Sequence, residues 1–301
     1  MKEYDPYIDK KPMQSNAIDS KAKKIPLKNY AKNAYKYRYL VQEIVRKNIK
    51  LQYRNSFLGM FWTFLQPLFT MIVLVLIFSN VFGNSNSGVV CYPIYVLCGR
   101  LIYECFSQST KRAMRSIRNS ASIIKKVYVP KYVYPLSNVL ANFITFLISL
   151  TVLVVVFAFF YIFQRETYPD LVLSWKFPLI IVPILLLFLL SFGCGMILSV
   201  LNVFFKDIEY IYEVFCMLLF YITPVFYKVS NLNLGGKEWF GYVLKLNPLY
   251  WIVDLFRSCI LVNGFDWNWK GFAYVLAFSV GSIIVGCYFF YKKQDKFILH
   301  I

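Results

Sequence analysis

Side chains that commonly perform catalysis or bind metals are scarce in this sequence. The single histidine, His300, is next to last in the chain, so Ser/His/Asp or Cys/His catalysis has no base within the body of the sequence. Seven cysteines form no Cys-x-x-Cys pair and mostly lie inside apolar runs, as small buried residues do. The sequence therefore predicts no catalytic residue, no metal site and no cofactor held by this chain.

One pair of charged residues lies where charge is costly. Arg100 and Glu104 interrupt an apolar run over residues 89–110, and their four-residue spacing places them on one face of a helix. An unpaired arginine at the centre of a membrane helix costs about 2.5–3.5 kcal/mol, so Arg100 should face a partner or a water-filled cavity. Two interpretations stay open: a structural ion pair, or an arginine that handles polar or anionic substrate while Glu104 holds it in place.

The elements that position these residues follow from composition. Hydrophobic residues make up 58% of the 301 residues and charged residues only 16%, against about a quarter in a soluble domain. Apolar runs alternate with charged segments, which is typical of an integral membrane protein. The net charge of +18 is explained by basic loops on one side of a membrane, so we expect no nucleic-acid partner.

The pattern predicts an all-α integral membrane protein with six transmembrane helices. Residues 1–35 form a polar tail, and residues 36–55 form an amphipathic, basic helix along the membrane surface, the start of a transmembrane domain that covers 36–301. Gly59 forms a hinge at the entrance of the first span, and Pro67 breaks the helical bond to the Thr63 carbonyl. The predicted spans are about 57–82, 89–110, 132–163, 177–205, 211–227 and 271–291.

Lysine and arginine counts predict the orientation. If the N-terminus is cytoplasmic, the inner segments hold 25 of these residues and the outer segments hold 7. Both termini are therefore expected inside. The outer region 228–268 contains an apolar stretch of only 14 residues, PLYWIVDLFRSCIL, which is too short to span. We expect two short re-entrant helices there, joined around Asn247 and Pro248.

Five segments, in this order and at these distances, resemble one known family. The resemblance is to the permease subunit of polysaccharide, O-antigen or teichoic-acid exporters of the ABC-2 type, and it covers residues 36–301. The segments are IVRKNIKLQYRNSFLGMFWTFLQPL (44–68), SIRNSASIIKKVYVP (116–130), NVFFKDI (202–208), ITPVFY (222–227) and LNPLYWIVDLFR (246–257).

This resemblance implies a half-transporter in the cytoplasmic (inner) membrane of a bacterium. Two permease copies would form the path for a lipid-linked glycan, as a homodimer or with a related permease, and two ATP-binding-cassette subunits would bind ATP and Mg²⁺ below them. The sequence has no GxxxxGK[ST] loop, so this chain is expected to have no ATPase activity of its own.

The resemblance also assigns roles to residues. Residues 112–126 correspond to the coupling segment that contacts the ATPase, although a basic inner loop has the same composition; its candidates are Arg115, Arg118, Asn119, Ile123, Ile124, Lys125 and Lys126. Candidates for binding the substrate's pyrophosphate, or alternatively anionic lipid, are Arg46, Lys47, Lys50 and Arg54. The geometry of an external gate would depend on Asn247, Pro248, Asp254 and Arg257. Asp207 is expected to cap the fifth span.

Two other functions remain open at this stage. An ABC-2 permease for a small drug or lipid would share most of these segments. A membrane-embedded glycosyltransferase or acyltransferase is the alternative from another class, but it would need paired acidic residues or a histidine at the membrane face, and acidic residues within the spans are sparse.

Overall fold

The computed structural model describes residues 37–54, 56–82, 91–126, 129–168, 171, 176–229, 238–261 and 267–297. The predicted tail 1–35 and His300 lie outside these residues. Within the described part every regular element is a helix, which confirms the predicted all-α class.

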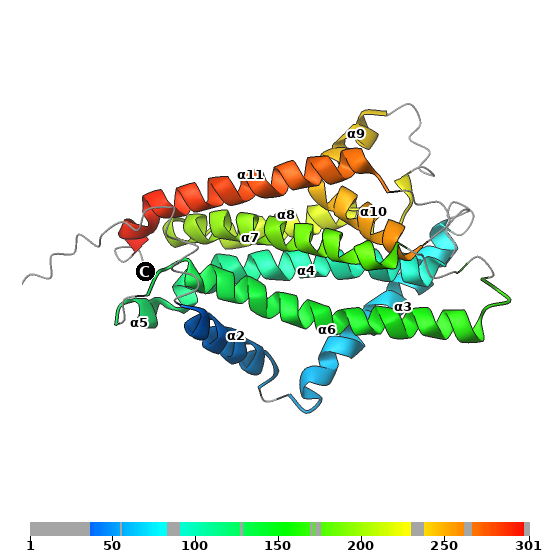
Figure 1. The fold of residues 1–301 in the computed structure, drawn as a ribbon, viewed down its shortest axis with the longest axis horizontal. Helices are drawn as coiled ribbons and strands as arrows, with labels where there is room; N and C mark the ends of the chain where they lie inside the picture. The colour runs from blue at the N-terminus through cyan, green and yellow to red at the C-terminus, as the bar shows by residue number, and fades with distance from the viewer. Residues whose placement is uncertain are drawn as a thin grey trace, which may run out of the picture. The chain divides into compact units, whose positions relative to one another are not determined.

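The α-helices follow the predicted order and are labelled in Figure 1. They are α2 (Arg38–Tyr53), α3 (Trp62–Phe82), α4 (Tyr92–Asn119), α5 (Ala121–Ile124), α6 (Val133–Phe163), α7 (Ile181–Phe204), α8 (Ile208–Ile222), α9 (Glu238–Leu246), α10 (Pro248–Ile260) and α11 (Trp269–Lys293). Single 3₁₀ turns precede α3 (η2, Gly59–Phe61) and α7 (η3, Phe177–Ile180) and follow α11 (η5, Gln294–Lys296).

Helix α4 lies at the centre of the bundle. It packs against α6 on one side and α7 on the other, and α11 packs on α7 (Figure 1). Helix α2 lies along α6 near α5, whereas α9 and α10 lie at the opposite end. We refer to these as the α5 end and the α10 end. Most side chains along α4 are buried, because this helix has neighbours on nearly every side.

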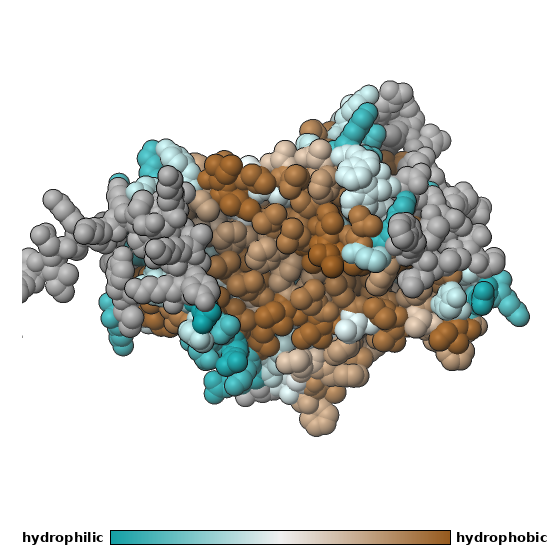
Figure 2. All heavy atoms as spheres, viewed as in Figure 1, coloured by the Kyte–Doolittle hydropathy of each residue, from teal (hydrophilic) through white to brown (hydrophobic). Residues whose placement is uncertain are grey.

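Four helical segments in the described residues are long and apolar enough to cross a membrane. They are Gly59–Phe78, Val133–Phe163, Phe177–Phe204 and Trp269–Lys296. Figure 2 shows the corresponding apolar band across the middle of one face, with hydrophilic residues toward both ends. Helix α4 carries several charged residues and α8 has only 15 residues, so the count of six spans stays a prediction.

The predicted coupling segment 112–126 differs from a loop. Helix α4 continues through it to Asn119, and the one-turn helix α5 follows after Ser120. The reason lies in the apolar stripe of α4, which extends past the predicted end of the span: Ala113, Met114 and Ile117 are all fully buried.

The start of α3 is shaped by Gly59 and Pro67. Gly59 has φ of 49°, a left-handed conformation that suits glycine, and it turns the chain from α2 into α3. Pro67 lies inside α3 and leaves the Thr63 carbonyl without its helical donor. The Ser149 hydroxyl of α6 lies 3.4 Å from that carbonyl oxygen. The same hydroxyl lies closer, at 3.1 Å, to the Thr145 carbonyl of its own helix, so α6 offers the Thr63 carbonyl only a long, shared donor.

Small residues allow α7 to approach its neighbours closely. A methyl group added at Gly193 would collide with the Ser282 hydroxyl and lie 2.7 Å from the Ile283 nitrogen of α11. By contrast, a methyl group at Gly281, on the outward face of α11, would meet nothing within 4 Å.

We predict that Gly193→Ala separates α7 from α11 and destabilises the protein by about 1–3 kcal/mol, because the added methyl meets backbone atoms that cannot move independently. The matched control Gly281→Ala should be neutral or slightly stabilising, since alanine favours a helix over glycine. Thermal unfolding of both variants in detergent tests this. Equal melting temperatures for the two variants would contradict the close α7/α11 packing.

Candidate functional site

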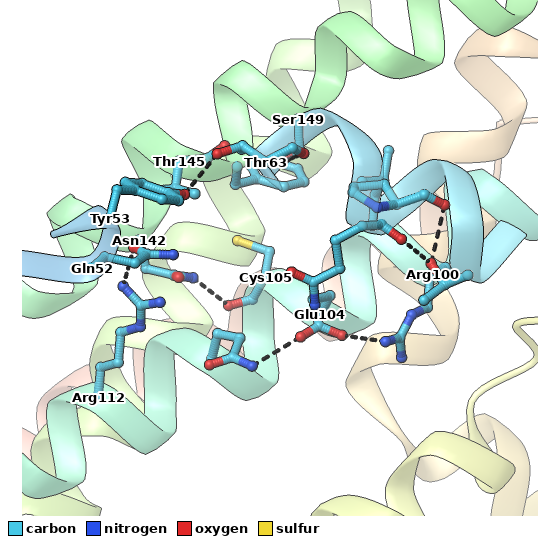
Figure 3. A pocket seen from close by; sticks show the side chains of 16 residues that line it. Gln52, Tyr53, Thr63, Arg100, Glu104, Cys105, Arg112, Asn142, Thr145 and Ser149 are labelled. Atoms are coloured by element: carbon cyan, nitrogen blue, oxygen red, sulfur yellow. Dashed lines mark hydrogen bonds and ion pairs between the residues drawn. The ribbon is translucent and has the colours of Figure 1, made fainter. Parts of the chain in front are cut away.

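A polar cavity of about 110 Å³ lies among the end of α2, α3, α4 and α6. Figure 3 shows it lengthwise, with Arg112 at one end and Arg100 at the other. Most of the lining residues carry hydrogen-bonding side chains, although Pro67, Leu101 and Phe146 also line the cavity. The lining residues with polar side chains include Gln52, Tyr53, Thr63, Gln66, Thr70, Arg100, Glu104, Gln108, Arg112, Asn142, Thr145 and Ser149.

Helix α4 contributes a row of four polar residues to this cavity. Arg100, Glu104, Gln108 and Arg112 recur every fourth residue, so they line one face of the helix. Arg100 Nη2 lies 2.7 Å from Glu104 Oε2, and Gln108 Nε2 donates to Glu104 Oε1 at 2.9 Å. Arg112 Nη1 donates to Gln52 Oε1 of α2 at 2.9 Å. The row therefore connects the middle of the bundle to the end of α2.

The opposite walls offer neutral hydrogen-bonding groups. The Tyr53 and Thr63 hydroxyls lie 2.6 Å apart, which ties α2 to α3. Asn142 Nδ2 of α6 donates to the Cys105 carbonyl at 3.1 Å and to the Ser109 hydroxyl at 2.9 Å. Together with the charged row of α4, these walls can hold a small polar group through several hydrogen bonds.

Arg100 reaches beyond this cavity. Its guanidinium carbon lies 5.6 Å from the centre of the Phe220 ring of α8, within range of a cation–π contact. Arg100 also lines a second, apolar hollow together with Phe69, Val73 and Phe220. Arg100, which pairs with Glu104, thus borders both the polar cavity and the apolar hollow between α3 and α8.

The four basic candidates on α2 and just after it do not line the cavity. Arg46 pairs with Glu43 at 3.1 Å on an exposed face, and Lys47, Lys50 and Arg54 are also exposed. The apolar face of α2 packs on α6, with Val45 buried. These cations therefore face away from the bundle, in the position expected for contact with lipid head groups.

The coupling candidates divide into two groups. Asn119, Ile123, Lys125 and Lys126 are exposed, whereas Ile124 is buried. Arg115 and Arg118 point toward α7 and α8 instead of forming a free surface.

The arginines of the second group form a network with α8. Arg115 Nε lies 3.0 Å from Glu209 Oε2, and Arg115 Nη2 lies 2.9 Å from Glu213 Oε1. Arg118 Nη1 lies 3.5 Å from Glu209 Oε1, and Asn202 Nδ2 donates to the same oxygen at 2.9 Å. This network joins the end of α4 to the start of α8.

The prediction that Asp207 caps α8 is wrong. Asp207 occupies the N-cap position, but its side chain makes no capping hydrogen bond. Its backbone has φ of −64° and ψ of −18°, whereas a capping residue normally has an extended backbone. Glu209, in the first turn, supplies the carboxylate at this helix terminus instead.

The 3₁₀ turn η5 contacts the segment that follows α5. Lys131 Nζ donates to the Gln294 carbonyl of η5. Burial lowers the pKa of the Lys131 ammonium, and the carboxylate of Asp295 partly opposes this shift. This hydrogen bond therefore joins the segment after α5 to η5.

At the α10 end, Arg257 is the central residue. It is 2% exposed, and its guanidinium donates to three backbone carbonyls: Tyr95 at 2.9 Å, Pro224 at 2.7 Å and Val225 at 2.8 Å. The guanidinium carbon also lies 3.4 Å from the centre of the Tyr95 ring. Arg257 thus fastens α10 to the start of α4 and to the segment after α8.

Other gate candidates support this arrangement. Asn247 Oδ1 accepts from the Leu249 nitrogen at 3.0 Å and caps α10, while its Nδ2 donates to the Thr223 hydroxyl at 2.9 Å. Pro248 takes the first position of α10, where its missing N–H has no helical partner to lose. Asp254 lies one turn before Arg257 and is half-buried.

Among the cavity residues that sequence reasoning missed are Gln108 and Arg112. Their signal was present, because they continue the four-residue spacing of Arg100 and Glu104 along the same helix. The contributions of Thr63 and Asn142 had no such signal, since only the packing of α3 and α6 around α4 brings them there.

Comparison with known proteins identifies the class. Residues 39–261 match the ABC-2 type transporter family, so the chain belongs to that family of membrane transport proteins.

Among its relatives are two O-antigen export system permease proteins called RfbA. The one from Klebsiella pneumoniae is 29% identical over 258 residues, which cover 86% of this chain and 93% of the relative. The one from Myxococcus xanthus is 29% identical over 226 residues, or 74% and 81% of the two chains. The polysialic acid transport protein KpsM of Escherichia coli is 20% identical over 263 residues, or 86% and 95%.

We predict that Arg257→Met destabilises the protein by more than about 3 kcal/mol, because three buried carbonyls lose donors worth about 1–3 kcal/mol each. Arg165→Met, at an exposed turn after α6, is the control and should change stability little. Denaturation of both purified variants measures the difference. A stability loss at position 257 no larger than at position 165 would refute the central role of Arg257.

Proposed function

We propose that this chain is the transmembrane subunit of an ATP-driven exporter that moves a lipid-linked polysaccharide, such as an O-antigen, a teichoic acid or another cell-surface glycan. The observation that carries the proposal is the polar cavity, which extends from the end of α2 to Arg100 in a chain whose relatives are O-antigen and polysialic acid permeases. Hydroxyl, amide and carboxylate groups in the cavity match the hydroxyl groups of sugars. An apolar drug would form no hydrogen bonds with these groups, so a small-drug permease is the weaker candidate.

The chain itself is a permease, and a separate ATP-binding subunit would supply the energy. Its proposed contact is the exposed surface formed by Asn119, Ile123, Lys125 and Lys126, at the α5 end. Apolar and basic side chains lie side by side there, which suits a tightly held docking helix. Movement of this surface would pass to α8 through Arg115 and Arg118, because their carboxylate partners are on α8.

Two copies would assemble the translocation path, with the α5 end of each in the cytoplasm of a bacterium and both termini on that side. Helix α8 supports this assembly: it is about 22 Å long, shorter than the hydrocarbon core, and leaves apolar side chains exposed on most of its surface. The exposed residues on α8 are Tyr210, Ile211, Val214, Phe215, Met217, Leu218 and Tyr221.

The docking proposal predicts that Lys125→Glu with Lys126→Glu weakens co-purification with the cognate ATP-binding subunit and lowers ATP hydrolysis by the complex several-fold. The physical reason is that two exposed cations at the contact become anions. The control reverses Lys292 of α11 and Lys296 of η5, which are exposed at the same end of the bundle but outside the proposed contact. Both proteins should insert into the membrane equally. Full complex formation and export by the first variant would remove α5 from the docking surface.

The proposed orientation predicts which positions an impermeant thiol reagent can reach in intact cells. In a background without the seven cysteines, Glu166→Cys, after α6, should be labelled from outside, and Ser122→Cys, in α5, only after the cells are permeabilised. Both positions are exposed, so burial does not explain a difference. Labelling of position 122 in intact cells would show that the orientation is the reverse of the one proposed.

A further inference from the structure

We propose that Phe297 and Lys131 position the α5 segment, because together they fasten the stretch between α5 and α6 to the ends of α7 and α11. Phe297 directly follows η5, at the same end of the bundle as α5 (Figure 1). Both are positioning residues, since neither belongs to the exposed surface proposed to contact the ATP-binding subunit. The inference rests on the proposed function only for the use that is made of α5.

Phe297 is buried although its neighbours in the sequence are charged. Its side chain is 0% exposed, whereas Asp295 and Lys296 are exposed. The Phe297 ring lies edge-on to the rings of Phe204 and Phe290, with 6.0 and 5.3 Å between ring centres. Phe204 ends α7, and Phe290 lies in the last turn of α11, so one ring joins the ends of two helices. Burial of such a side chain contributes about 1.5–3 kcal/mol.

Lys131 brings the segment after α5 to the same ring. Its ammonium group donates to the Gln294 carbonyl and lies 5.6 Å from the centre of the Phe297 ring, within range of a cation–π contact. Lys125 and Lys126, earlier in the same segment, are exposed. An ammonium group that partly leaves water is costly unless other contacts replace the water. The carbonyl and the ring therefore favour one position of the Lys131 segment.

The stretch of chain between Lys131 and α5 is short. Lys131 comes seven residues after Ile124, the last residue of α5. Ile124 and Pro130 are both buried, and the Pro130 carbonyl accepts from the Val133 nitrogen at 3.1 Å, at the start of α6. A helix of four residues is too short to be stable alone. The position of α5 therefore depends on the end of α4 before it and on the Lys131 contacts after it.

The Phe297 contacts also reach the connection into α8. Only three residues separate Phe204, at the end of α7, from Ile208, at the start of α8. The Lys293 ammonium of α11 lies 5.6 Å from the centre of the Phe204 ring, so α11 holds this aromatic group through a second side chain. Loss of the Phe297 ring should therefore loosen the segment after α5 and the end of α7 together.

The test measures amide hydrogen exchange of the full-length chain in nanodiscs without the ATP-binding subunit, so its outcome is independent of the proposed function. Exchange reports local opening of backbone hydrogen bonds, which residues 123–126 and 133–134 make in this segment. A residue that only stabilises the whole fold affects exchange throughout the chain, whereas a positioning residue affects the stretch that it holds.

The variants are Phe297→Ala and Lys131→Met. Lys131→Met keeps most of the side-chain length and removes the donor, so it tests the same contact without emptying a buried site. The matched control is Phe143→Ala, which also removes a buried ring. Phe143 packs edge-on to Phe188 of α7 at 5.0 Å and lies ten residues, or about 15 Å, into α6.

We expect Phe297→Ala and Lys131→Met each to raise exchange in residues 121–134 several-fold. Phe143→Ala should lower the melting temperature to a similar degree but leave exchange in residues 121–134 close to that of the unmodified chain. The proposal is overturned if neither Phe297→Ala nor Lys131→Met raises exchange there, or if Phe143→Ala raises it equally. Should Phe297→Ala fail to fold, Lys131→Met decides between these outcomes.

A second measurement separates this inference from the docking proposal. In the complex with the cognate ATP-binding subunit, Phe297→Ala should lower ATP hydrolysis several-fold although the exposed surface of α5 is unchanged. If exchange rises in residues 121–134 while hydrolysis stays the same, the positioning of α5 is supported, and the ATPase contact assigned to α5 is the part that fails.

Discussion

The buried guanidinium of Arg257 is the interaction on which the α10 end depends. A charge this deep is tolerated only because three carbonyls and an aromatic face replace the water it loses. Two of those carbonyls, of Pro224 and Val225, are available because α8 ends at Thr223 and the chain leaves helical geometry there. Gly99 completes the arrangement, since a methyl group at that position would lie 2.6 Å from the Arg257 Nη2 atom. The end of α8, Gly99 of α4 and Arg257 of α10 therefore depend on one another.

The start of α8 is also held by partly buried arginine side chains of α4. Arg115 of α4 pairs with Glu209 and Glu213 in the first turns of α8, so α4 and α8 are held together at the α5 end by ion pairs. Between the two ends, the Tyr103 hydroxyl donates to the Cys216 carbonyl, and the Tyr212 hydroxyl donates to Thr110. The short helix α8 is therefore attached to the long helix α4 along its whole length. These contacts form a continuous connection between the α5 end and the α10 end.

Several features of the fold could be read from the sequence because they depend on local composition. The apolar runs, the two short helices joined at Asn247, the Gly59 turn and the break at Pro67 all follow from the preferences of residues close together in the chain. The extension of α4 to Asn119 could have been anticipated from the buried stripe that ends at Ile117, but the basic residues in between suggested a loop. The capping role expected of Asp207 failed because its backbone is helical.

The sequence by itself determined the class of protein: an all-helical membrane chain with basic segments at one end, no nucleotide-binding loop, and the ordered segments of an ABC-2 permease. It also placed Arg100 and Glu104 on one helix face, since that requires only helical periodicity. Only the tertiary structure decided that Arg112 borders the cavity while Lys50 faces outward, and that Arg257 is buried while Lys125 is exposed. The physical reason is that a charged residue has the same local helix propensity whether its side chain faces lipid, water or buried carbonyl groups. Which of these it meets is decided by the helices packed around it.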